Sequence, residues 1–342
     1  MKTLINTTEL SAALADPSLV VVDLSSPEVY LQGHIPGAIS FPLFTNEERA
    51  QVGICYKQQG RDAAVELGFD LLGPKLGDMV RQAKAIAPDR ALRVHCWRGG
   101  MRSGGVAWGL EMAGFQVTTL AGGYKSFRRW ARQVFSQPRQ IIVLGGMTGT
   151  GKTDILHAIA QRGENVLDLE RLANHRGSSY GSLGLDPQPS NEQFENEIAM
   201  QLWQCDRDRP IWVEGESRRI GLCRVPDALF NQMLAAPMLE VVRSRAERVA
   251  ILVEVYRVAS REELAIATER LRKRLGGQRT QAAIAHIQSG QLAEACDIIL
   301  DYYDRTYDHA LKRQTGPCQP IDITGCTAEE GATQLLKRAA DQ

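Results

Sequence analysis

Apolar residues along this chain follow two periods, an alternating one and a helical one, and these periods succeed each other in both halves. Short runs rich in β-branched residues end in turn formers at 19–25, 91–96 and 115–120, and helically spaced stretches separate them. Strands that alternate with helices in this way form a parallel sheet covered by helices. The first half is therefore predicted to be an α/β domain.

The second half repeats this alternation after a break. Strands are predicted at 141–146, 165–169 and 210–216, and helices are predicted from about residue 152 and near 192–204. The pattern indicates a second α/β unit, which is followed by a long, helical, Arg-rich stretch. We find no internal repeat and no low-complexity segment.

A basic and aromatic segment, YKSFRRWARQVFSQPR at 124–139, separates the two patterns. A chain of 342 residues is longer than one hydrophobic core usually covers, so two domains are expected. We predict a first domain over residues 1–130, a linker over 131–138 and a second domain over 139–342 that ends in the helical extension.

Composition adds mainly exclusions. The chain is 44% hydrophobic and 23% charged, with 40 basic and 40 acidic residues, so any nucleic-acid contact must come from a local basic face. The first residues lack the apolar core of a signal peptide, and no stretch of about 18 apolar residues occurs, so we expect a cytoplasmic protein with no membrane contact. Seven cysteines without CxxC spacing predict reduced thiols and no bound metal.

One cysteine has neighbours that suggest chemistry. Cys96 ends an apolar strand and is followed by WRGGMRS, which supplies two glycines, two arginines and a helix start. Backbone N–H groups of such a turn converge on one point and, with arginine side chains, hold an anion or stabilise a thiolate. We therefore predict Cys96, Arg98 and Arg102 as catalytic residues.

The first domain resembles the rhodanese family over roughly residues 5–130. The resemblance rests on GHIPGAI at 33–39, which matches the GHIPGA signature, and on the cysteine loop. It implies a rhodanese-like fold in which Cys96 carries sulfur as a persulfide. His34 is expected to bond backbone near the sheet, and Cys55 is either an ordinary buried thiol or a resolving thiol.

The spacing Cys96-x5-Arg102 departs from common sulfurtransferase loops, which are one residue shorter. The longer loop makes a wider cradle, suited to a tetrahedral oxyanion such as phosphate or selenophosphate. This spacing also resembles tyrosine and dual-specificity phosphatases, so phosphatase activity is an alternative. No acidic loop that could supply a general acid is identifiable in the sequence.

The second domain begins with a phosphate-binding motif. GMTGTGKT at 146–153 fits G-x-x-x-x-G-K-[ST] at every fixed position, between a strand and a helical pattern. It predicts a P-loop NTPase-like domain that binds a diphosphate or triphosphate, with a lysine on the terminal phosphate and a threonine suited to Mg²⁺. The predicted phosphate-binding residues are Gly146, Gly149, Gly151, Lys152 and Thr153.

Three acidic residues at strand ends are candidates for a Mg²⁺ ligand or an acid/base group: Asp168, Glu214 and Glu216. Acidic residues at strand ends are often merely solvated, and the pattern does not choose among the three. No convincing water-positioning residue is present, so hydrolysis of ATP or GTP stays open.

Two segments combine charges suited to RNA. Residues 241–280 hold ten Lys and Arg against five acids, on a helical pattern that Gly276 and Gly277 are expected to stop. The segment at 124–130 sets basic residues beside Tyr, Phe and Trp, a mixture suited to single-stranded loops. Solvated helix faces or contacts between domains would explain the same residues. The candidate RNA-binding residues are Lys125, Arg128, Arg129, Arg270, Arg272, Lys273 and Arg274.

Taken together, CWRGGMRS, GGMTGTGKT, LDLERLANHRGSSYG and VEGESRRIG resemble the tRNA 2-selenouridine synthase family over essentially the whole chain. The resemblance implies an enzyme that replaces the sulfur of 2-thiouridine in the tRNA anticodon loop with selenium, through an S-geranylated base. It implies selenophosphate and geranyl diphosphate as substrates, no tightly bound cofactor, and selenophosphate synthetase as the supplier.

On this interpretation the P-loop holds the diphosphate and the Cys96 loop holds selenophosphate, although the loops could exchange roles or share a substrate. His175, Arg218 and Arg219 lie in the family-typical segments without assigned roles. Two other classes stay open. One is a Cys-x5-Arg phosphatase or sulfurtransferase fused to a nucleotide-binding regulatory domain, and the other is a non-catalytic RNA-binding module.

Overall fold

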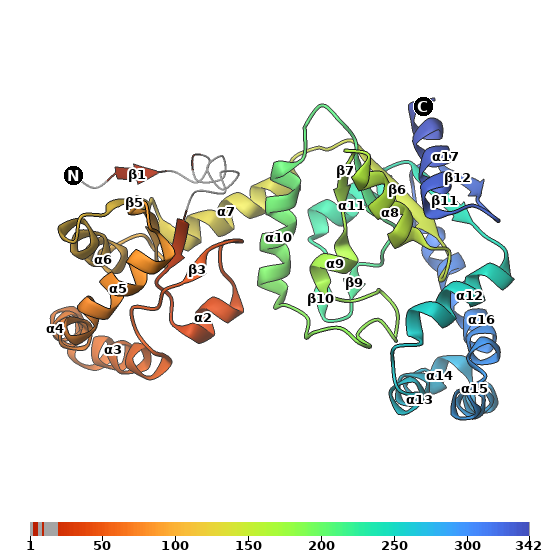
Figure 1. Ribbon diagram of the computed structural model, residues 1–342, viewed down its shortest axis with the longest axis horizontal. Coiled ribbons are helices and arrows are strands. Elements are labelled where there is room, and N and C mark those ends of the chain that lie inside the picture. The colour runs from red at the N-terminus through yellow and green to blue at the C-terminus, as the bar shows by residue number, and fades with distance from the viewer. Residues whose placement is uncertain (1–2, 6–8, 10–19, 342) are drawn as a thin grey trace. The chain divides into compact units, whose positions relative to one another are not determined.

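A computed structural model describes residues 3–5, 9 and 20–341 (Figure 1). The chain forms two compact units, and each combines two separate stretches of sequence. Unit 1 contains the residues up to Val134 together with Glu195–Gln204, and unit 2 contains Phe135–Phe194 and Cys205–Gln342. No local sequence pattern predicts that residues 195–204 pack with the first unit.

Unit 1 is built on a parallel five-stranded sheet with the strand order β1-β5-β4-β2-β3. The strands predicted at 19–25, 91–96 and 115–120 are present and lie next to one another at its centre. The elements of unit 1 are β1 (Thr3–Ile5), β2 (Val20–Asp23), α2 (Pro27–Gln32), β3 (Ile39–Ser40), α3 (Asn46–Gln59), α4 (Arg61–Leu72), the short 3-10 helix η1 (Gly73–Lys75), α5 (Leu76–Ile86), β4 (Ala91–His95), α6 (Met101–Met112), β5 (Gln116–Leu120) and α7 (Gly123–Ser136), whose last two residues belong to unit 2.

The basic and aromatic segment at 124–139 forms most of helix α7, whose aromatic side chains face inward. Tyr124, Phe127, Ala131 and Val134 are buried, and their spacing of three or four residues sets them on one face of the helix. The predicted linker, 131–138, begins within this helix.

Helix α10 (Asn191–Gln204) contributes a buried polar network to unit 1. The Asn196 side-chain amide donates to the backbone oxygen of His34 and to the Tyr124 hydroxyl, each at 2.8 Å. Its oxygen accepts from Arg128 at 2.6 Å, and Arg128 also pairs with Glu195. Asn196 is fully buried, so this network satisfies groups that water does not reach.

Unit 2 holds a second parallel five-stranded sheet, of order β12-β11-β6-β8-β7, and a two-stranded hairpin. The strands predicted at 141–146, 165–169 and 210–216 are again present, whereas β11 and β12 were not predicted. The elements are β6 (Ile141–Gly146), α8 (Lys152–Gln161), β7 (Asn165–Leu167), α9 (Leu169–Ala173), β8 (Ile211–Glu214), β9 (Arg219–Ile220), β10 (Cys223–Arg224), α11 (Asp227–Ala235), β11 (Met238–Val242), α12 (Arg245–Tyr256), α13 (Arg261–Arg270), α14 (Arg272–Leu275), α15 (Gly277–Ser289), α16 (Leu292–Leu311), β12 (Cys318–Asp322) and α17 (Ala328–Ala340).

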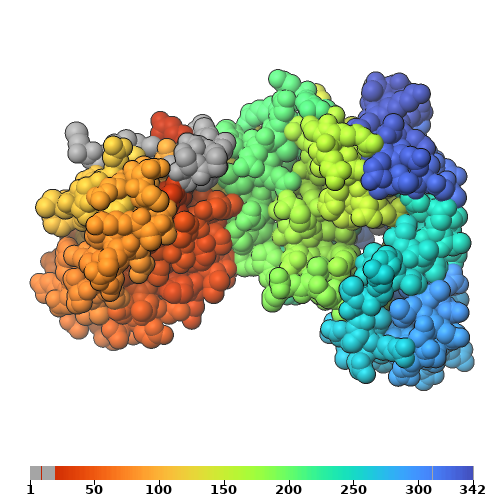
Figure 2. Space-filling view, in the orientation of Figure 1, coloured from red at the N-terminus to blue at the C-terminus, as the bar shows by residue number. Residues whose placement is uncertain are grey.

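The central strands of unit 2 are buried on both faces. Every residue of β6 and β8 is buried, and Trp212 lies in the same core as Leu144 and Ile155. Helices α12 to α16 form a separate lobe of this unit with its own apolar core, seen in cyan and light blue in Figure 2. The single helix expected before Gly276 is two helices, α13 and α14, and Gly276 ends the second.

The fold class predicted from the sequence, two α/β domains with a helical Arg-rich extension, is confirmed. In the described part of the chain, no helix has both the length and the apolar composition needed to cross a bilayer.

Replacing Asn196 with Ala should lower the free energy of unfolding of unit 1 by about 1–3 kcal/mol, because it strands buried polar partners. Denaturant unfolding followed by tryptophan fluorescence measures this, since Trp97, Trp108, Trp130 and Trp203 belong to unit 1. Substitution of the exposed Gln204 in the same helix is the control and should change stability by less than about 0.5 kcal/mol. Equal stability of the two variants would contradict the role of the network.

Candidate functional site

The Cys96 loop is a strand-to-helix turn that is braced by a neighbouring turn. The loop joins β4 to α6, and Gly99 adopts a positive φ of 64° within it. Gly123 (φ 58°) lies so close to the backbone of Cys96 and Gly99 that a Cβ atom there would overlap with it. The Tyr124 N–H donates to the Cys96 oxygen at 3.0 Å. These contacts fix the direction of the loop's backbone.

The environment of Cys96 favours its thiolate. In the neutral state the thiol donates to the Ser103 hydroxyl at 3.5 Å, and that hydroxyl donates to the Gly100 oxygen at 3.1 Å. Once the thiol ionises, the hydroxyl rotates and donates to the sulfur instead. Burial of Cys96 opposes ionisation, but it is outweighed by the Ser103 hydroxyl and N–H groups, the Arg102 charge and the Gly100 N–H. The pKa of Cys96 is lowered as a result. Sequence reasoning missed Ser103, whose signal was a hydroxyl in the first turn of the helix after the loop.

The two loop arginines lie differently. Arg102 is half-buried and acts electrostatically on Cys96, whereas Arg98 is exposed. Within the described residues neither has an ion-pair partner. Both charges are therefore available to an anion at the loop.

His34 and Cys55, which the sequence analysis also considered, both have contacts or burial typical of residues that support the fold. The Nδ1 atom of His34 lies 2.9 Å from the Tyr30 backbone oxygen, and its ring stacks on Tyr30, as the structural interpretation expected. Cys55 is buried in α3. Behind the loop, His95 and Asp23 are both buried, with 3.9 Å between His95 Nε2 and Asp23 Oδ2, and burial lowers the pKa of His95.

The second loop, residues 146–153, joins β6 to α8 as the motif predicts. Gly146, Gly149 and Gly151 all have positive φ. A Cβ atom on Gly146 would crowd the Val241 oxygen, and one on Gly149 would crowd the Arg248 oxygen. Glycine is therefore required at these positions for the loop to curl with its N–H groups inward.

The two side chains that the motif supplies lie at the mouth of this loop. The Lys152 ammonium donates to the backbone oxygens of Gly146 at 2.8 Å and Met147 at 3.4 Å, so it already lies over the loop. The Thr153 hydroxyl donates to Glu170 at 3.2 Å. A threonine and a carboxylate at this separation fit a Mg²⁺ ion that also binds phosphate oxygens and water.

Three glutamates gather beside Lys152; Glu214 is buried, and Glu170 and Glu216 are half-buried. Burial, followed by the charges of Glu216 and Glu214, raises the pKa of Glu170 to about 9. Burial and the charges of Asp168 and Glu216 raise the pKa of Glu214 to about 8, and burial raises that of Glu216. Among the described residues no group of three or more ligands is arranged as a complete metal site. A cation here would need oxygens from a ligand as well.

The sequence named Asp168, Glu214 and Glu216 but missed Glu170, the carboxylate that contacts Thr153. Asp168 caps α9 by accepting from the Arg171 N–H at 2.8 Å and lies 2.8 Å from His157 Nε2, so its oxygens are engaged. Glu170 follows Asp168 by two residues. The Glu170 side chain reaches the P-loop because α9 begins at Leu169. The pattern LDLERL does not show where that helix begins, so the sequence does not single out Glu170.

The segment after α9 lies against these carboxylates. A Cβ atom on Gly177 would overlap with Glu216 and Glu170, so the backbone passes directly beside them. His175 is buried, and burial with the Arg176 charge lowers its pKa. Its ring therefore favours the neutral form. Arg218 pairs with Asp227 at 3.0 Å, which gives it a structural partner.

The candidate RNA-binding residues separate into two groups. The prediction that Arg128 binds RNA is wrong for this structure. Arg128 is buried and bound to Asn196 and Glu195, so it presents no charge to a polynucleotide. The aromatic rings beside it, Tyr124, Phe127 and Trp130, are buried too, because they form the inner face of α7. The other candidates are exposed: Lys125, Arg129, Arg270, Arg272, Lys273 and Arg274.

Three arginines counted in the basic excess at 241–280 have structural partners instead. Arg243 donates to the Thr150 oxygen at 3.3 Å and Arg248 to the Thr148 oxygen at 2.9 Å, so both brace the P-loop. Arg245 binds Asp297 and Asp301. The basic surface is therefore smaller than the sequence suggested and is centred on α13 and α14.

Fold and loops together define a two-domain protein that joins a cysteine-bearing anion loop to a P-loop domain. A family model described as the Rhodanese-like domain matches residues 6–129, and one described as the tRNA 2-selenouridine synthase AAA domain matches residues 139–321. These matches confirm the predicted class of each domain.

Full-length relatives extend the match. Proteins named tRNA 2-selenouridine synthase from Marinobacter nauticus, Pseudomonas fluorescens and Shewanella denitrificans are 34%, 37% and 32% identical to this chain. The alignments cover 86%, 91% and 86% of this chain and 89%, 92% and 89% of the relatives. The chain belongs to the tRNA 2-selenouridine synthase family, as the sequence motifs predicted.

Replacing Ser103 with Ala should raise the pKa of Cys96 by about one to two units. A hydrogen bond to a charged group is worth about 1.5–3 kcal/mol, and one pKa unit corresponds to about 1.4 kcal/mol. The pH dependence of Cys96 alkylation by iodoacetamide, read by peptide mass mapping, gives the value. Cys96→Ser should remove the labelled peptide, and an unchanged midpoint in the Ser103 variant would show that this contact does not stabilise the thiolate.

The raised pKa values of Glu170 and Glu214 predict that the free energy of unfolding depends on pH. An unfolded glutamate loses its proton near 4.5, whereas folded Glu170 and Glu214 keep theirs to about 9 and about 8. Between these values the folded state binds more protons, so the free energy of unfolding falls as pH rises from about 5 to about 9. Below about 4.5 both states are protonated and the effect vanishes.

Thermal unfolding across this range measures the effect, and Glu214→Gln should flatten the decline. Substitution of the exposed Glu262 by Gln should leave the slope as it is. Mg²⁺ with diphosphate should stabilise the protein more at high pH than at low pH, because the cation binds ionised carboxylates. An identical slope in the Glu214 variant would refute this assignment.

Proposed function

We propose that this chain is an enzyme that converts 2-thiouridine in tRNA to 2-selenouridine in two successive steps. Geranyl diphosphate would first alkylate the sulfur at the P-loop, and selenophosphate would then supply selenium at the Cys96 loop. The observation that carries the proposal is the presence of two separate anion-binding loops in one chain, one beside a thiol of lowered pKa and one beside Lys152. Membership of the family supports the choice of tRNA as the substrate.

The first step transfers a prenyl group. The thiocarbonyl sulfur attacks C1 of the geranyl group, the C1–O bond breaks, diphosphate leaves with the bonding electrons, and the N3 proton passes to water. The P-loop N–H groups and Lys152 would stabilise the charge that develops on the diphosphate. Bound Mg²⁺, held by Thr153 and Glu170, would supply further positive charge to this leaving group.

Alkylation prepares the base for exchange. The C2–S bond of 2-thiouridine is a poor site for displacement, whereas an S-alkylated sulfur leaves C2 as a thiolate. The geranyl group thus serves as an activating group on sulfur, which explains why one protein would combine a prenyl donor with a selenium donor.

The second step delivers selenium without any change of oxidation state. The Cys96 thiolate attacks the phosphorus of selenophosphate, the P–Se bond breaks, and selenide leaves. Selenide attacks C2 of the S-geranylated base, the C2–S bond breaks, and geranyl thiolate leaves. Water then cleaves the S–P bond, which releases phosphate and restores Cys96. Loop N–H groups, Arg98 and Arg102 would bind the three phosphate oxygens.

This role for Cys96 differs from that of a persulfide carrier. Selenium in selenophosphate is already fully reduced, so attack at phosphorus needs no additional electron donor. The wide Cys96-x5-Arg102 loop and the Ser103 hydroxyl suit a phosphorus electrophile. The same features favour a second candidate function, hydrolysis of phosphate monoesters.

The exposed basic residues on α13 and α14 would contact tRNA phosphates. Arg270 and Lys273 have no ion-pair partner within the described residues, whereas Arg272 pairs with Glu269 at 2.5 Å and Arg274 donates to the Tyr302 hydroxyl at 3.1 Å. Selenophosphate synthetase would supply the selenium donor, since selenophosphate is the product of that class of enzyme.

Substitutions in the two loops should affect different steps of the reaction. With thiolated tRNA and both donors, Lys152→Ala should reduce S-geranylation at least about 100-fold, a loss typical of removing a group that stabilises transition-state charge. Cys96→Ala should leave S-geranylation intact and abolish 2-selenouridine. Nucleoside mass analysis of digested tRNA measures both products.

Two results would decide against this assignment. Equal loss of both products in each variant would contradict the division of labour. Unchanged 2-thiouridine with the wild-type protein, together with hydrolysis of an aryl phosphate that Cys96→Ser abolishes, would favour the phosphatase function instead.

A further inference from the structure

The residue that follows Cys96 is a tryptophan whose side chain reaches solvent. Cys96 itself is only 2% exposed, whereas Trp97 is 37% exposed and Met101 is 53% exposed. Arg98, between them, is exposed as well. The outer surface of this loop is therefore formed by side chains other than the nucleophile, and two of the three are apolar. A substrate that approaches the buried sulfur meets this surface first.

Contacts with α7 hold Trp97 at both its backbone and its ring. The Trp97 backbone oxygen accepts from the Lys125 N–H at 3.0 Å, in the first turn of that helix. The Trp97 ring tilts against the ring of Tyr124, with 5.4 Å between the two centroids. Tyr124 is buried, and its hydroxyl accepts from the Asn196 amide at 2.8 Å. A ring supported in this way loses little conformational entropy when a ligand packs against its exposed part.

The stretch of chain that forms this surface is strongly basic. Residues 96–129 contain five basic residues and one acidic residue, Glu111, which lies near the C-terminal end of α6. Arg128 is bound to Glu195. The other four cations form no ion pair within the described part of the chain: Arg98, Arg102, Lys125 and Arg129. This excess of unpaired positive charge is complementary to a polyanion.

An exposed aromatic ring among unpaired cations is typical of surfaces that bind single-stranded nucleic acid. On such surfaces the ring stacks on an unpaired base, and the cations contact the phosphates on either side of it. A small anion at the Cys96 loop would use only the backbone N–H groups and the arginines, so it gives no reason for a tryptophan at this position. Packing of the core does not require the exposed part of the ring either. A planar base accounts for both features.

From this arrangement we propose that Trp97 binds the nucleobase that is modified, by stacking on it beside the Cys96 loop. Lys125 and Arg129, which are exposed and four residues apart on α7, contact the neighbouring phosphates of the anticodon loop. The inference rests on the proposed function and adds the residue that recognises the base. Stacking on Trp97 brings C2 of the base close to the loop at which selenium leaves selenophosphate.

A pair of RNA stem-loops tests the proposal. One carries 2-thiouridine in its loop, and the other has an abasic site at that position and is otherwise identical. Trp97→Ala in the full-length protein should weaken binding of the first RNA by about five- to 100-fold, the loss typical of removing one stacking ring. It should leave binding of the abasic RNA unchanged. Fluorescence anisotropy of the labelled RNAs at one fixed salt concentration measures both affinities.

Further variants separate stacking from other effects. Trp97→Phe should keep most of the affinity because phenylalanine also stacks, whereas Trp97→Leu, which is apolar but not aromatic, should bind as weakly as the alanine variant. Lys125→Ala should weaken both RNAs alike, because it removes a phosphate contact. Trp108→Ala removes an exposed tryptophan further along α6 and should bind both RNAs as the wild type does. An unchanged pH midpoint of Cys96 alkylation shows that the loop is intact in each variant.

The possible failures are distinguishable. Equal affinity of the wild-type protein for the two RNAs, or equal weakening of both by Trp97→Ala, would overturn the stacking assignment. Full affinity in Trp97→Leu would overturn it too, because an apolar contact without stacking would then suffice. The phenylalanine and leucine variants decide the question if the alanine variant disturbs the loop. Base-dependent binding that is lost in Trp97→Ala, in a protein that makes no 2-selenouridine, would support the role of Trp97 and defeat the proposed function.

Discussion

The convergence of backbone N–H groups at two strand-to-helix turns is the constraint on which this structure depends. Each turn needs residues that can adopt positive φ and that tolerate close approach of a neighbouring backbone. Gly99 and Gly123 meet this need around Cys96, and Gly146 and Gly149 meet it in the P-loop. A side chain at any of these positions would displace the backbone that forms the site, so the chemistry of both loops follows from main-chain geometry.

Charge around these loops is arranged differently in the two units. At the first loop, Ser103, Arg102 and backbone N–H groups outweigh burial and leave a thiol of lowered pKa. At the second, burial raises the pKa values of Glu170, Glu214 and Glu216, although the positive charge of Lys152 nearby lowers them in part. This arrangement of charge suits a nucleophilic thiolate at the first loop and, at the second, the binding of a cation together with an anionic ligand, as proposed above.

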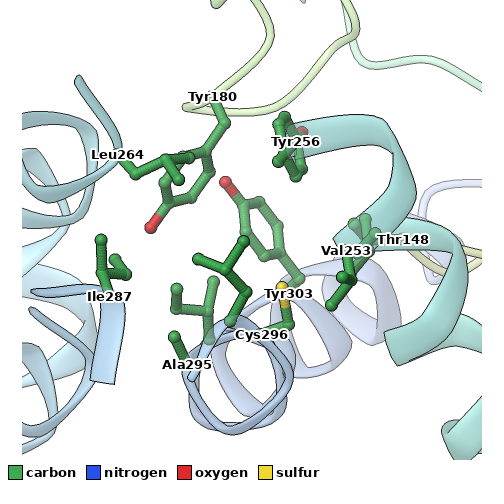
Figure 3. A pocket seen from close by; sticks show the side chains of 12 residues that line it. Thr148, Tyr180, Val253, Tyr256, Leu264, Ile287, Ala295, Cys296 and Tyr303 are labelled. Carbon is green, nitrogen blue, oxygen red and sulfur yellow. The ribbon is translucent and has the colours of Figure 1, made fainter. Parts of the chain in front are cut away.

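Local sequence patterns predicted much of the fold and both anion-binding loops. The central strands of both sheets, the P-loop and the Cys96 loop are each specified by residues adjacent in the chain. Other features depend on tertiary contacts. Glu170 reaches Thr153 because α9 begins at Leu169, and Arg128 is buried because a distant helix supplies Asn196 and Glu195. The apolar core of the helical lobe combines Tyr180 with residues of helices α13, α15 and α16, among them Leu264, Ile287 and Ala295 (Figure 3), so no single motif could announce it.

The proposed function requires that one chain modify the same base twice in a fixed order. A time course with thiolated tRNA, both donors and the wild-type protein, sampled by nucleoside mass analysis, tests it most directly. We expect S-geranyl-2-thiouridine to rise first and to decline as 2-selenouridine accumulates. Formation of 2-selenouridine at full rate when geranyl diphosphate is left out would contradict it.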